Sequence, residues 1–417
     1  MLKKSNESYV TFIKKLGVEN IINYGIICWL CFAPVNFILS NLAESIYLGA
    51  GKVVMLLLYL LALLVALVVF PVTFSRLNRK TFLFSLFGVL VVISSLYMSE
   101  DKLYFIKTLR TMVLRGIPLF LLFSTVKSSE KVLKNFEITG ILMVVAGLLS
   151  VTVFREEHFH HGSSGYSMYT GYQTLVASIF LMGSILYKPK LITVVMLLIS
   201  VIVNIMSGTR GPLLLEIILL ILMLVLVIIN RCSIKMKIFL LVFLIIIVSV
   251  LCIFNDVFEY LISQPLFTKY SRSLRLLMSG DFLKSDGRIE IFSTSMDMIT
   301  SNLFFGPGII NERIEIGKRV SIGPTYSHNF FLEILTQFGT IPGTLLLIFF
   351  VRAIIKKYDS SKEFKDKILL VVLVFSAILP LLLSGSYIEW PMFYVLMGYL
   401  LNTENFMFKQ NIGDIEL

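Results

Sequence analysis

A row of long apolar segments constrains the fold of this chain more than any other feature. Hydrophobic residues make up 57% of the sequence and charged residues only 15%, and the mean hydropathy is +0.88. Soluble domains are about 45–50% apolar and about 25% charged, so a soluble globular protein is excluded. Windows of about 19 residues, long enough to cross a bilayer as a helix, locate twelve segments. These are 20–42, 52–74, 82–98, 109–126, 136–154, 168–187, 191–207, 211–230, 236–254, 329–353, 368–384 and 388–403. We therefore predict an all-α polytopic membrane protein with about twelve transmembrane helices.

The distribution of Lys and Arg predicts the orientation of these helices. With a cytoplasmic N-terminus, every loop that would face the cytoplasm carries basic residues, from Lys3 near the start to Lys409 near the end. The positive-inside rule then places both termini in the cytoplasm. The net charge of +11 is explained by this topology and by contact with anionic membrane lipid, so nucleic acid is not expected as a partner.

The longest extramembrane segment spans residues 255–328, between the ninth and tenth predicted helices, and the topology places it outside. Within it, 289–303 has the periodicity of a short helix, and Gly306-Pro307-Gly308 predicts the turn that follows. Arg288 stands just before this helix and is a candidate binding residue for an anion. Taken alone it is weak, since an arginine in a polar loop is usually solvated.

The predicted seventh and eighth helices are joined at the outer surface by Ser207-Gly-Thr-Arg210-Gly-Pro212. A short turn with two glycines and a proline holds Arg210 in place, and Pro212 suits the first turn of a helix. Exposed backbone N–H groups at that helix start would add positive potential beside the guanidinium, which favours a phosphate ligand. The alternative is an arginine that reaches the lipid headgroups.

The tenth predicted helix begins with Tyr326-Ser-His328-Asn329-Phe-Phe-Leu-Glu333. His328 lies at the N-terminal end of the helix, where the helix dipole disfavours the imidazolium, and a neutral imidazole can accept a proton. A capping or interfacial histidine is the alternative. Glu333 is an acidic group one turn deeper, and we expect it to pair with His328 or with an arginine.

The remaining histidines and the cysteines indicate no metal centre or disulfide framework. His158, His160 and His161 cluster in an outer loop, but their spacing does not define a closed metal site. Cys28 and Cys31 have CxxC spacing inside an apolar run, where packing is the expected role. Tyr172, one of three tyrosines at the outer end of the sixth helix, is either an interfacial residue or a platform for a sugar.

Three motifs follow one another along the second half of the chain: Ser207-Gly-Thr-Arg210-Gly211, then Gly287-Arg288 with Gly306-Pro-Gly308, then His328-Asn329-Phe-Phe-Leu-Glu333 with Gly339. Their order and spacing resemble the O-antigen ligase and O-antigen polymerase family, which comprises bacterial membrane glycosyltransferases of the GT-C class. The resemblance implies a GT-C-like fold with the long outer loop between helices 9 and 10. The chain departs from many relatives at Phe292, where they carry tryptophan.

The resemblance also suggests how the chain is divided. Residues 1–160 would form N-terminal helices 1–5, residues 161–354 the catalytic core with the outer loop 255–328, and residues 355–417 helices 11–12 and a cytoplasmic tail. By resemblance the protein lies in the bacterial inner or plasma membrane, with its active site on the outer face.

The resemblance implies transfer of a sugar chain from an undecaprenyl pyrophosphate carrier to an acceptor hydroxyl. Arg210 and Arg288 would hold the pyrophosphate and His328 would be the base. Tyr326, Asn329, Tyr172 and Glu333 are the further candidates for binding substrate. Neutralised pyrophosphate is a good leaving group, so an inverting displacement requires neither a metal nor a cofactor. A flippase and a chain-length regulator are the protein partners that the resemblance implies.

Several functions fit these residues. The sequence is rich in Ile, Lys, Phe and Ser, and this amino-acid usage indicates an A·T-rich genome. It favours a capsule or exopolysaccharide polymerase, which extends lipid-linked repeat units. A ligase would instead transfer a finished glycan to another acceptor. A lipid-linked oligosaccharide flippase or transporter would have a similar helix number, but it would place polar residues at mid-membrane. The His-Asn entry to the tenth helix speaks against a cell-wall polymerase of the shape-and-division type.

Overall fold

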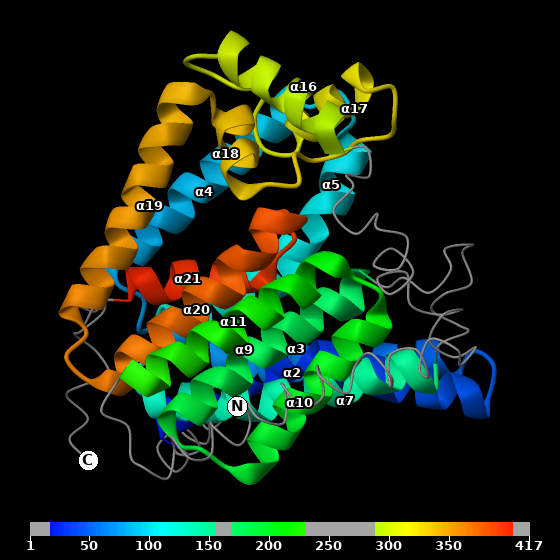
Figure 1. The fold of residues 1–417 in the computed structure, drawn as a ribbon. Helices are drawn as coiled ribbons and strands as arrows, with labels where there is room; N and C mark the ends of the chain where they lie inside the picture. The colour runs from blue at the N-terminus through cyan, green and yellow to red at the C-terminus, as the bar shows by residue number, and fades with distance from the viewer. Residues whose placement is uncertain (1–16, 155–167, 230–287, 403–417) are drawn as a thin grey trace, which may run out of the picture. The chain divides into compact units, whose positions relative to one another are not determined.

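The computed structural model describes residues 17–154, 168–229 and 288–402, and these residues form helices and connecting loops without any strand (Figure 1). In chain order the helices are α2 (Val18–Ile46), α3 (Ala50–Phe74), α4 (Arg79–Met98), α5 (Lys102–Thr111), the π-helical turn η1 (Met112–Gly116), α6 (Ile117–Phe123), α7 (Ser129–Thr152), α9 (Met168–Tyr187), α10 (Leu191–Ser207), α11 (Arg210–Ile229), α16 (Arg288–Ser301), α17 (Asn311–Arg319), α18 (Phe330–Phe338), α19 (Thr340–Ser360), α20 (Phe364–Leu383) and α21 (Pro391–Leu401).

The predicted apolar segments are mostly helical where the structure describes them. The predicted sixth and seventh segments have the same bounds as α9 and α10, and most others differ only at their ends. Five helices, α2, α3, α4, α7 and α20, are long and apolar enough to cross a membrane. The polytopic membrane class is therefore confirmed. The segment 236–254 lies outside the described residues, so the count of twelve and the GT-C-like architecture stay predictions.

The fourth predicted segment begins earlier than the sequence indicated. Helix α5 starts at Lys102, where Asp101 caps it by accepting a hydrogen bond from the Tyr104 backbone N–H (2.9 Å), and the chain remains helical through η1 and α6. The predicted start at residue 109 was wrong because Lys102 and Lys107 lower the hydropathy of the first turns without preventing helix formation.

The tenth predicted segment, 329–353, is two helices rather than one. Gly339 has φ +89° and ψ 164°, a conformation that ends α18 and begins α19. The exposed backbone at the break is paired with the segment after α16, since Thr340 N–H donates to Asn302 O (3.0 Å) and Ile341 N–H donates to Leu303 O (2.9 Å). The single-helix prediction was wrong because these contacts come from residues far away in the sequence.

The chain divides into two compact units. Unit 1 comprises Met1–Leu30, Leu56–Val132 and Ser285–Leu417, and unit 2 comprises Cys31–Met55 and Leu133–Lys284. In unit 2, α9 packs against both α10 and α11. Helix α7 also approaches α9 closely, with the rings of Phe136 and Phe180 stacked at 4.1 Å and Gly140 facing the Ala177 carbonyl.

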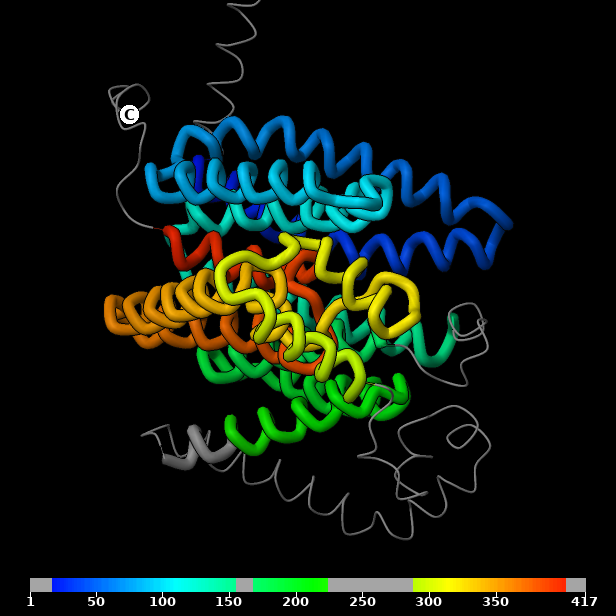
Figure 2. Tube along the Cα trace, turned by 90° about the horizontal axis from the view of Figure 1, so that it is seen from above, coloured from blue at the N-terminus to red at the C-terminus, as the bar shows by residue number. Residues whose placement is uncertain are grey.

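In unit 1, α21 packs against α6, and α18 contacts α16, α19 and α20. The approach of α21 to α6 requires a glycine, because a Cβ at Gly398 would lie 2.3 Å from the Phe120 carbonyl oxygen. Helices α19 and α20 run side by side (Figure 2). The segment around Gly306 is pressed against the end of α18, where a Cβ would lie 2.2 Å from the Thr336 carbonyl oxygen.

The cysteines that the structure describes have the packing role that the sequence predicted. Neither Cys28 nor Cys31 is in a disulfide, and Cys31 is buried with its Sγ 3.3 Å from Thr139 Oγ1. The histidine cluster at residues 158–161 lies outside the described residues.

Candidate active site

Arg288 is the first residue of α16, which confirms the predicted helix after it. The buried face of α16 presents Ile291 and Met298 to Ile316 of α17, and this small apolar cluster fixes the helix over the loop that follows α17. From this position Arg288 Nη1 donates a hydrogen bond to the Leu383 carbonyl at the end of α20 (3.0 Å). The side chain is half-buried.

His328 stands at the start of α18, as predicted, but it does not cap the helix. The cap is Asn329, whose Oδ1 accepts hydrogen bonds from the backbone N–H groups of Phe331 (3.0 Å) and Leu332 (3.3 Å). His328 has φ +53°, a conformation uncommon outside glycine and asparagine, and it turns the chain just before the cap. Such strained positions gather at functional sites.

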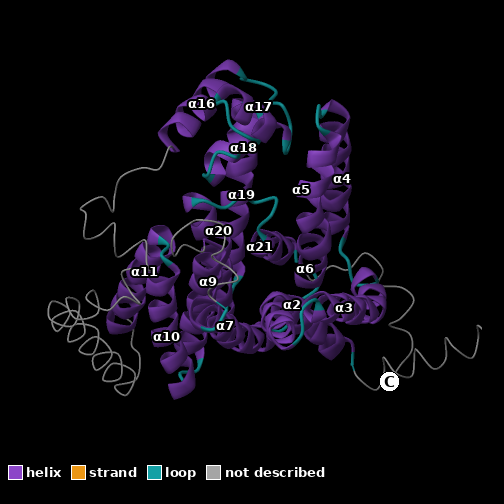
Figure 3. Ribbon diagram, turned by 90° about the vertical axis from the view of Figure 1, so that its right-hand side faces the viewer, coloured by secondary structure: helices purple, strands orange, loops and turns teal. Residues whose placement is uncertain are grey.

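The side chains of Arg288, Tyr326 and His328 meet at the last residues of α20. The Tyr326 ring lies 4.3 Å from the His328 ring, and the Tyr326 hydroxyl donates to the Ser384 carbonyl (2.6 Å). His328 Nδ1 lies 3.2 Å from Ser384 Oγ, one residue beyond the carbonyl that binds Arg288. Figure 3 shows α16, α17 and α18 beside one another at this end of unit 1. Three residues singled out from the sequence therefore form one cluster.

The electrostatics of this cluster keep His328 neutral. Burial, together with the positive charges of Arg288 and Arg313, lowers the pKa of His328 to about 4, and a hydrogen bond with the Ser384 backbone opposes the shift only in part. Burial also raises the pKa of Tyr326 to about 12, so its hydroxyl stays protonated and continues to donate. At neutral pH the imidazole can accept a proton, which is what a general base requires.

A buried cluster of charged groups beneath these residues was missed by the sequence analysis. Its centre is Arg313 of α17, only 3% exposed, whose guanidinium lies 3.8 Å from a Glu333 carboxylate oxygen and 3.5 Å from one of Glu389. Arg313 also donates to Ser386 Oγ (2.6 Å) and stacks on the Tyr326 ring at 5.1 Å. The expected partner of Glu333 is therefore an arginine, and it is Arg313.

Glu312 completes the buried cluster. Its Oε1 lies 3.8 Å from Arg313 Nε and accepts a hydrogen bond from Gln337 Nε2 (2.7 Å). Burial raises the pKa of Glu312, and the positive charge of Arg313 opposes this shift. Helix α17 was not predicted, because charged side chains make up more than half of its nine residues. The one signal in the sequence was the unpaired carboxylate of Glu333.

Arg210 and Tyr172 belong to unit 2. Helix α10 ends at Gly208, which has the left-handed conformation (φ +73°), and α11 begins at Arg210 with Pro212 in its first turn, as predicted. Ser207 Oγ lies 2.8 Å from Thr209 Oγ1 and donates to the Asn204 carbonyl (2.9 Å). Tyr172 is 8% exposed on α9.

A buried carboxylate lies under the Arg210 turn. Glu216 of α11 accepts hydrogen bonds from Ser200 Oγ (2.7 Å), from Asn204 Nδ2 and from Ser178 Oγ, so that it joins α9, α10 and α11. Through Asn204, Ser207 and Thr209 this network is continuous with the residue before Arg210. Polar contacts within unit 2 thus hold the turn that carries Arg210.

Gly171 is the point where α9 supports this turn, and Gly171→Ala is expected to destabilise the protein. The new Cβ would lie 1.9 Å from Thr209 Oγ1 and 2.8 Å from Thr209 Cβ, so rotating the Thr209 side chain cannot relieve the clash. Overpacking of this kind costs about 1–3 kcal/mol. The control is Gly88→Ala in α4, where nothing lies within 4 Å of the new Cβ. Thermal unfolding of both variants in detergent is the measurement, and equal midpoints would contradict this interpretation.

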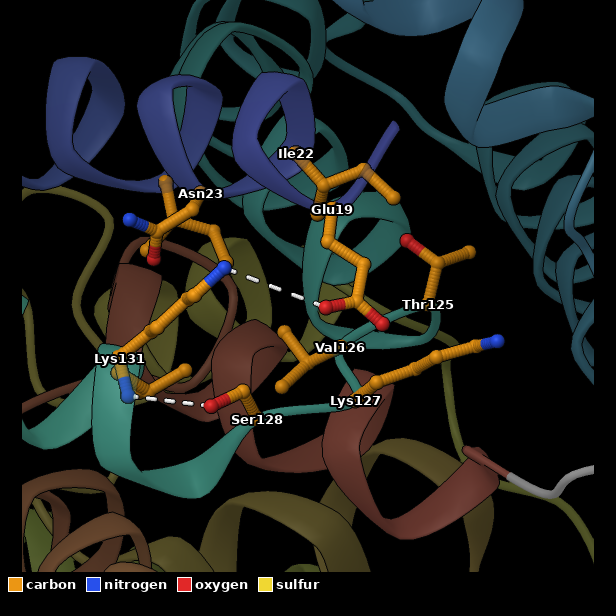
Figure 4. A pocket seen from close by; sticks show the side chains of 10 residues that line it. Glu19, Ile22, Asn23, Thr125, Val126, Lys127, Ser128 and Lys131 are labelled. Carbon is orange, nitrogen blue, oxygen red and sulfur yellow. Dashed lines mark hydrogen bonds and ion pairs between the residues drawn. The ribbon is translucent and has the colours of Figure 1, made fainter. Parts of the chain in front are cut away.

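A cavity of about 20 Å³ lies elsewhere in unit 1, lined by residues that include Glu19, Asn23, Ser128 and Lys131 (Figure 4). Lys131 Nζ lies 4.0 Å from Glu19 across it. A space of this size holds about one water molecule, so it is no substrate site. Among the described residues no group of three or more His, Cys, Asp or Glu side chains could hold a metal ion.

Comparison with known protein families finds a match for the segment that contains most of these residues. Residues 194–348 match the family model described as O-antigen ligase. This segment is similar to the O-antigen ligase family. The predicted resemblance is thereby confirmed over these residues, and members of that family are glycosyltransferase-like enzymes. The matched segment includes Arg210, Arg288, Tyr326, His328, Asn329 and Glu333. No curated protein and no solved structure matches the chain.

Proposed function

We propose that this protein transfers an oligosaccharide from undecaprenyl pyrophosphate to a hydroxyl acceptor at the outer face of the bacterial cell membrane, and that it polymerises repeat units into a surface polysaccharide. The observation that carries the proposal is the meeting of Arg288, Tyr326 and a neutral His328 at the end of α20. These groups supply an anion-binding guanidinium beside a base, the pair that the reaction requires.

The proposed reaction is a single displacement. His328 takes the proton of the acceptor hydroxyl while the acceptor oxygen forms a bond to the anomeric carbon. The bond between that carbon and the pyrophosphate oxygen breaks, and the pyrophosphate leaves with the electron pair. Arg288 stabilises its developing charge, Arg210 stays a candidate for the same role by the resemblance alone, and the configuration at the anomeric carbon is inverted.

The other candidate residues have supporting roles in this proposal. Asn329 Oδ1 is occupied by the α18 cap, so its Nδ2 group is the part that would bind a sugar. Glu333 is fully buried and bonded to Ser386 and the Tyr387 N–H, which favours positioning of the site over direct contact. Tyr326 and Tyr172 would contact the glycan. A flippase and a chain-length regulator remain expectations from the resemblance.

A ligase that transfers a finished glycan is the second candidate, favoured by the description of the matching family as O-antigen ligase. The products distinguish the two functions. A polymerase yields a ladder of lipid-linked chains that differ by one repeat unit, whereas a ligase yields a single adduct of donor and separate acceptor. Movement of lipid-linked glycan across the membrane without glycan growth would instead indicate a flippase.

The test is transfer from a lipid-pyrophosphate oligosaccharide by the purified full-length protein in bilayer discs. Arg288→Lys keeps the charge but removes the bidentate fork, so we expect the KM for donor to rise about tenfold, the effect of losing about 1.4 kcal/mol of binding. Arg288→Ala and Arg210→Ala should each impair transfer further. The control is Arg319→Ala, because Arg319 is exposed and paired only locally with Glu315. Unimpaired transfer by both alanine variants would refute the assignment of the pyrophosphate site.

A further inference from the structure

Both Tyr326 and His328 contact Ser384, a residue to which the proposed reaction assigns no role. It lies directly after α20 and is 3% exposed. Its backbone N–H and that of Gly385 both donate to the Pro380 carbonyl, at 3.1 and 3.0 Å. Two residues later, Ser386 accepts a hydrogen bond from Arg313 and donates one to Glu333. Ser384 is therefore held rigidly from both sides.

Ser384 contacts the His328 ring with its hydroxyl and its backbone. Its Oγ lies 3.2 Å from Nδ1, and its backbone also forms a hydrogen bond with the ring. A carbonyl oxygen can only accept, so the ring nitrogen that faces Ser384 must carry a hydrogen, and Nδ1 is the nitrogen that lies within 3.2 Å of this residue. The Oγ group, which can donate or accept, then accepts from the same N–H. This arrangement leaves the lone pair on Nε2.

We propose that Ser384 is a positioning residue that holds His328 as the Nδ1–H tautomer, so that Nε2 is the atom that accepts the proton of the acceptor hydroxyl. The inference rests on the proposed function, because it assigns His328 the role of base. It adds a residue that touches no substrate and acts through the imidazole, as an orienting group does for the base in other enzymes.

The charged and titratable groups around His328 determine how its pKa would respond to a substitution at Ser384. Arg288 of α16 and Arg313 of α17 act on the ring, and Tyr326 stacks on it from the same loop. Glu333 of α18 and Glu389, which precedes α21, face Arg313 rather than the imidazole. No carboxylate of the described residues is bonded to the ring, so adding one at Ser384 would change the charge that it senses.

Three substitutions of Ser384 distinguish an effect on the orientation of His328 from an effect on folding. Ser384→Thr keeps the hydroxyl. Valine has almost the same shape as threonine, so Ser384→Val removes the hydroxyl without a further change in shape. We expect kcat to fall about 5–10-fold in Ser384→Val, which is the effect expected for the loss of one hydrogen bond. In Ser384→Thr kcat should be largely retained. The KM for donor should be unchanged in both variants. Ser384→Asp places a carboxylate beside Nδ1, so the acidic limb of kcat/KM should move up by about one pH unit or more.

The matched control is Ser376→Ala, because Ser376 is buried in α20 and its hydroxyl donates to the Leu373 carbonyl of the same helix. Equal kcat in Ser384→Thr and Ser384→Val, with both folded, would overturn the positioning role, as would an unmoved pH profile in a folded Ser384→Asp. These results would leave the proposed function intact if His328→Asn is inactive. Full activity of His328→Asn would instead remove the base, and the proposed function with it.

Discussion

His328→Asn is expected to lower kcat for glycan transfer by about 10²–10⁴-fold, the contribution usual for a general base. Asparagine tolerates the positive φ of this position and its side chain can still reach Ser384, but the amide cannot accept a proton at neutral pH. Donor binding should persist because Arg288 is untouched. The measurement is single-turnover transfer beside equilibrium binding of the lipid-linked donor.

The pH dependence provides an independent check of the same residue. The base acts when deprotonated, so activity is lost as the pH falls through the pKa of His328. That pKa is about 4 in the free enzyme, so kcat/KM should stay level from neutral pH down to about 5 and decline below it. A bound pyrophosphate would offset the charge of Arg288 and raise the pKa in the complex. A kcat/KM profile that falls near pH 6.5 would argue against the buried, arginine-flanked imidazole.

Arg313→Met is expected to lower the free energy of unfolding by about 3–5 kcal/mol, the usual cost of removing one partner from a buried ion pair. Methionine fills the space but leaves Glu312 and Glu333, both fully buried, without their cation. The Tyr326 ring also loses the guanidinium beneath it, so transfer should be lost with stability. The measurement is thermal unfolding of the purified protein in bilayer discs.

Two comparisons make this prediction specific. Arg319→Met removes an exposed arginine of the same helix, whose i,i+4 pair with Glu315 is worth about 0.3–0.5 kcal/mol. Adding Glu333→Gln to Arg313→Met should recover part of the loss, because the second change removes one of the stranded carboxylates. Equal stability of Arg313→Met and Arg319→Met would contradict the central place of Arg313 in the cluster.

The candidate site residues could be singled out from the sequence because each lies beside a local signal. Arg210 follows a glycine turn, Arg288 precedes a periodic segment, and His328 stands next to a good N-cap. Such signals depend on neighbours within a few residues. Arg288 contacts Leu383, which lies 95 positions away in the sequence, and His328 contacts Ser384, which lies 56 positions away. No local sequence pattern encodes these contacts.

The sequence by itself determined the membrane class, the approximate positions of most helices and the family resemblance, because apolar length, turn residues and motif order are properties of short segments. Only the tertiary structure decided that the tenth segment breaks at Gly339, since backbone groups from residues 302 and 303 fill the break. It also decided that α17 is a helix and that Arg313 pairs with Glu333 and Glu389. A buried charge is tolerated only where distant partners neutralise it, so its place in the fold depends on the packing of the whole unit.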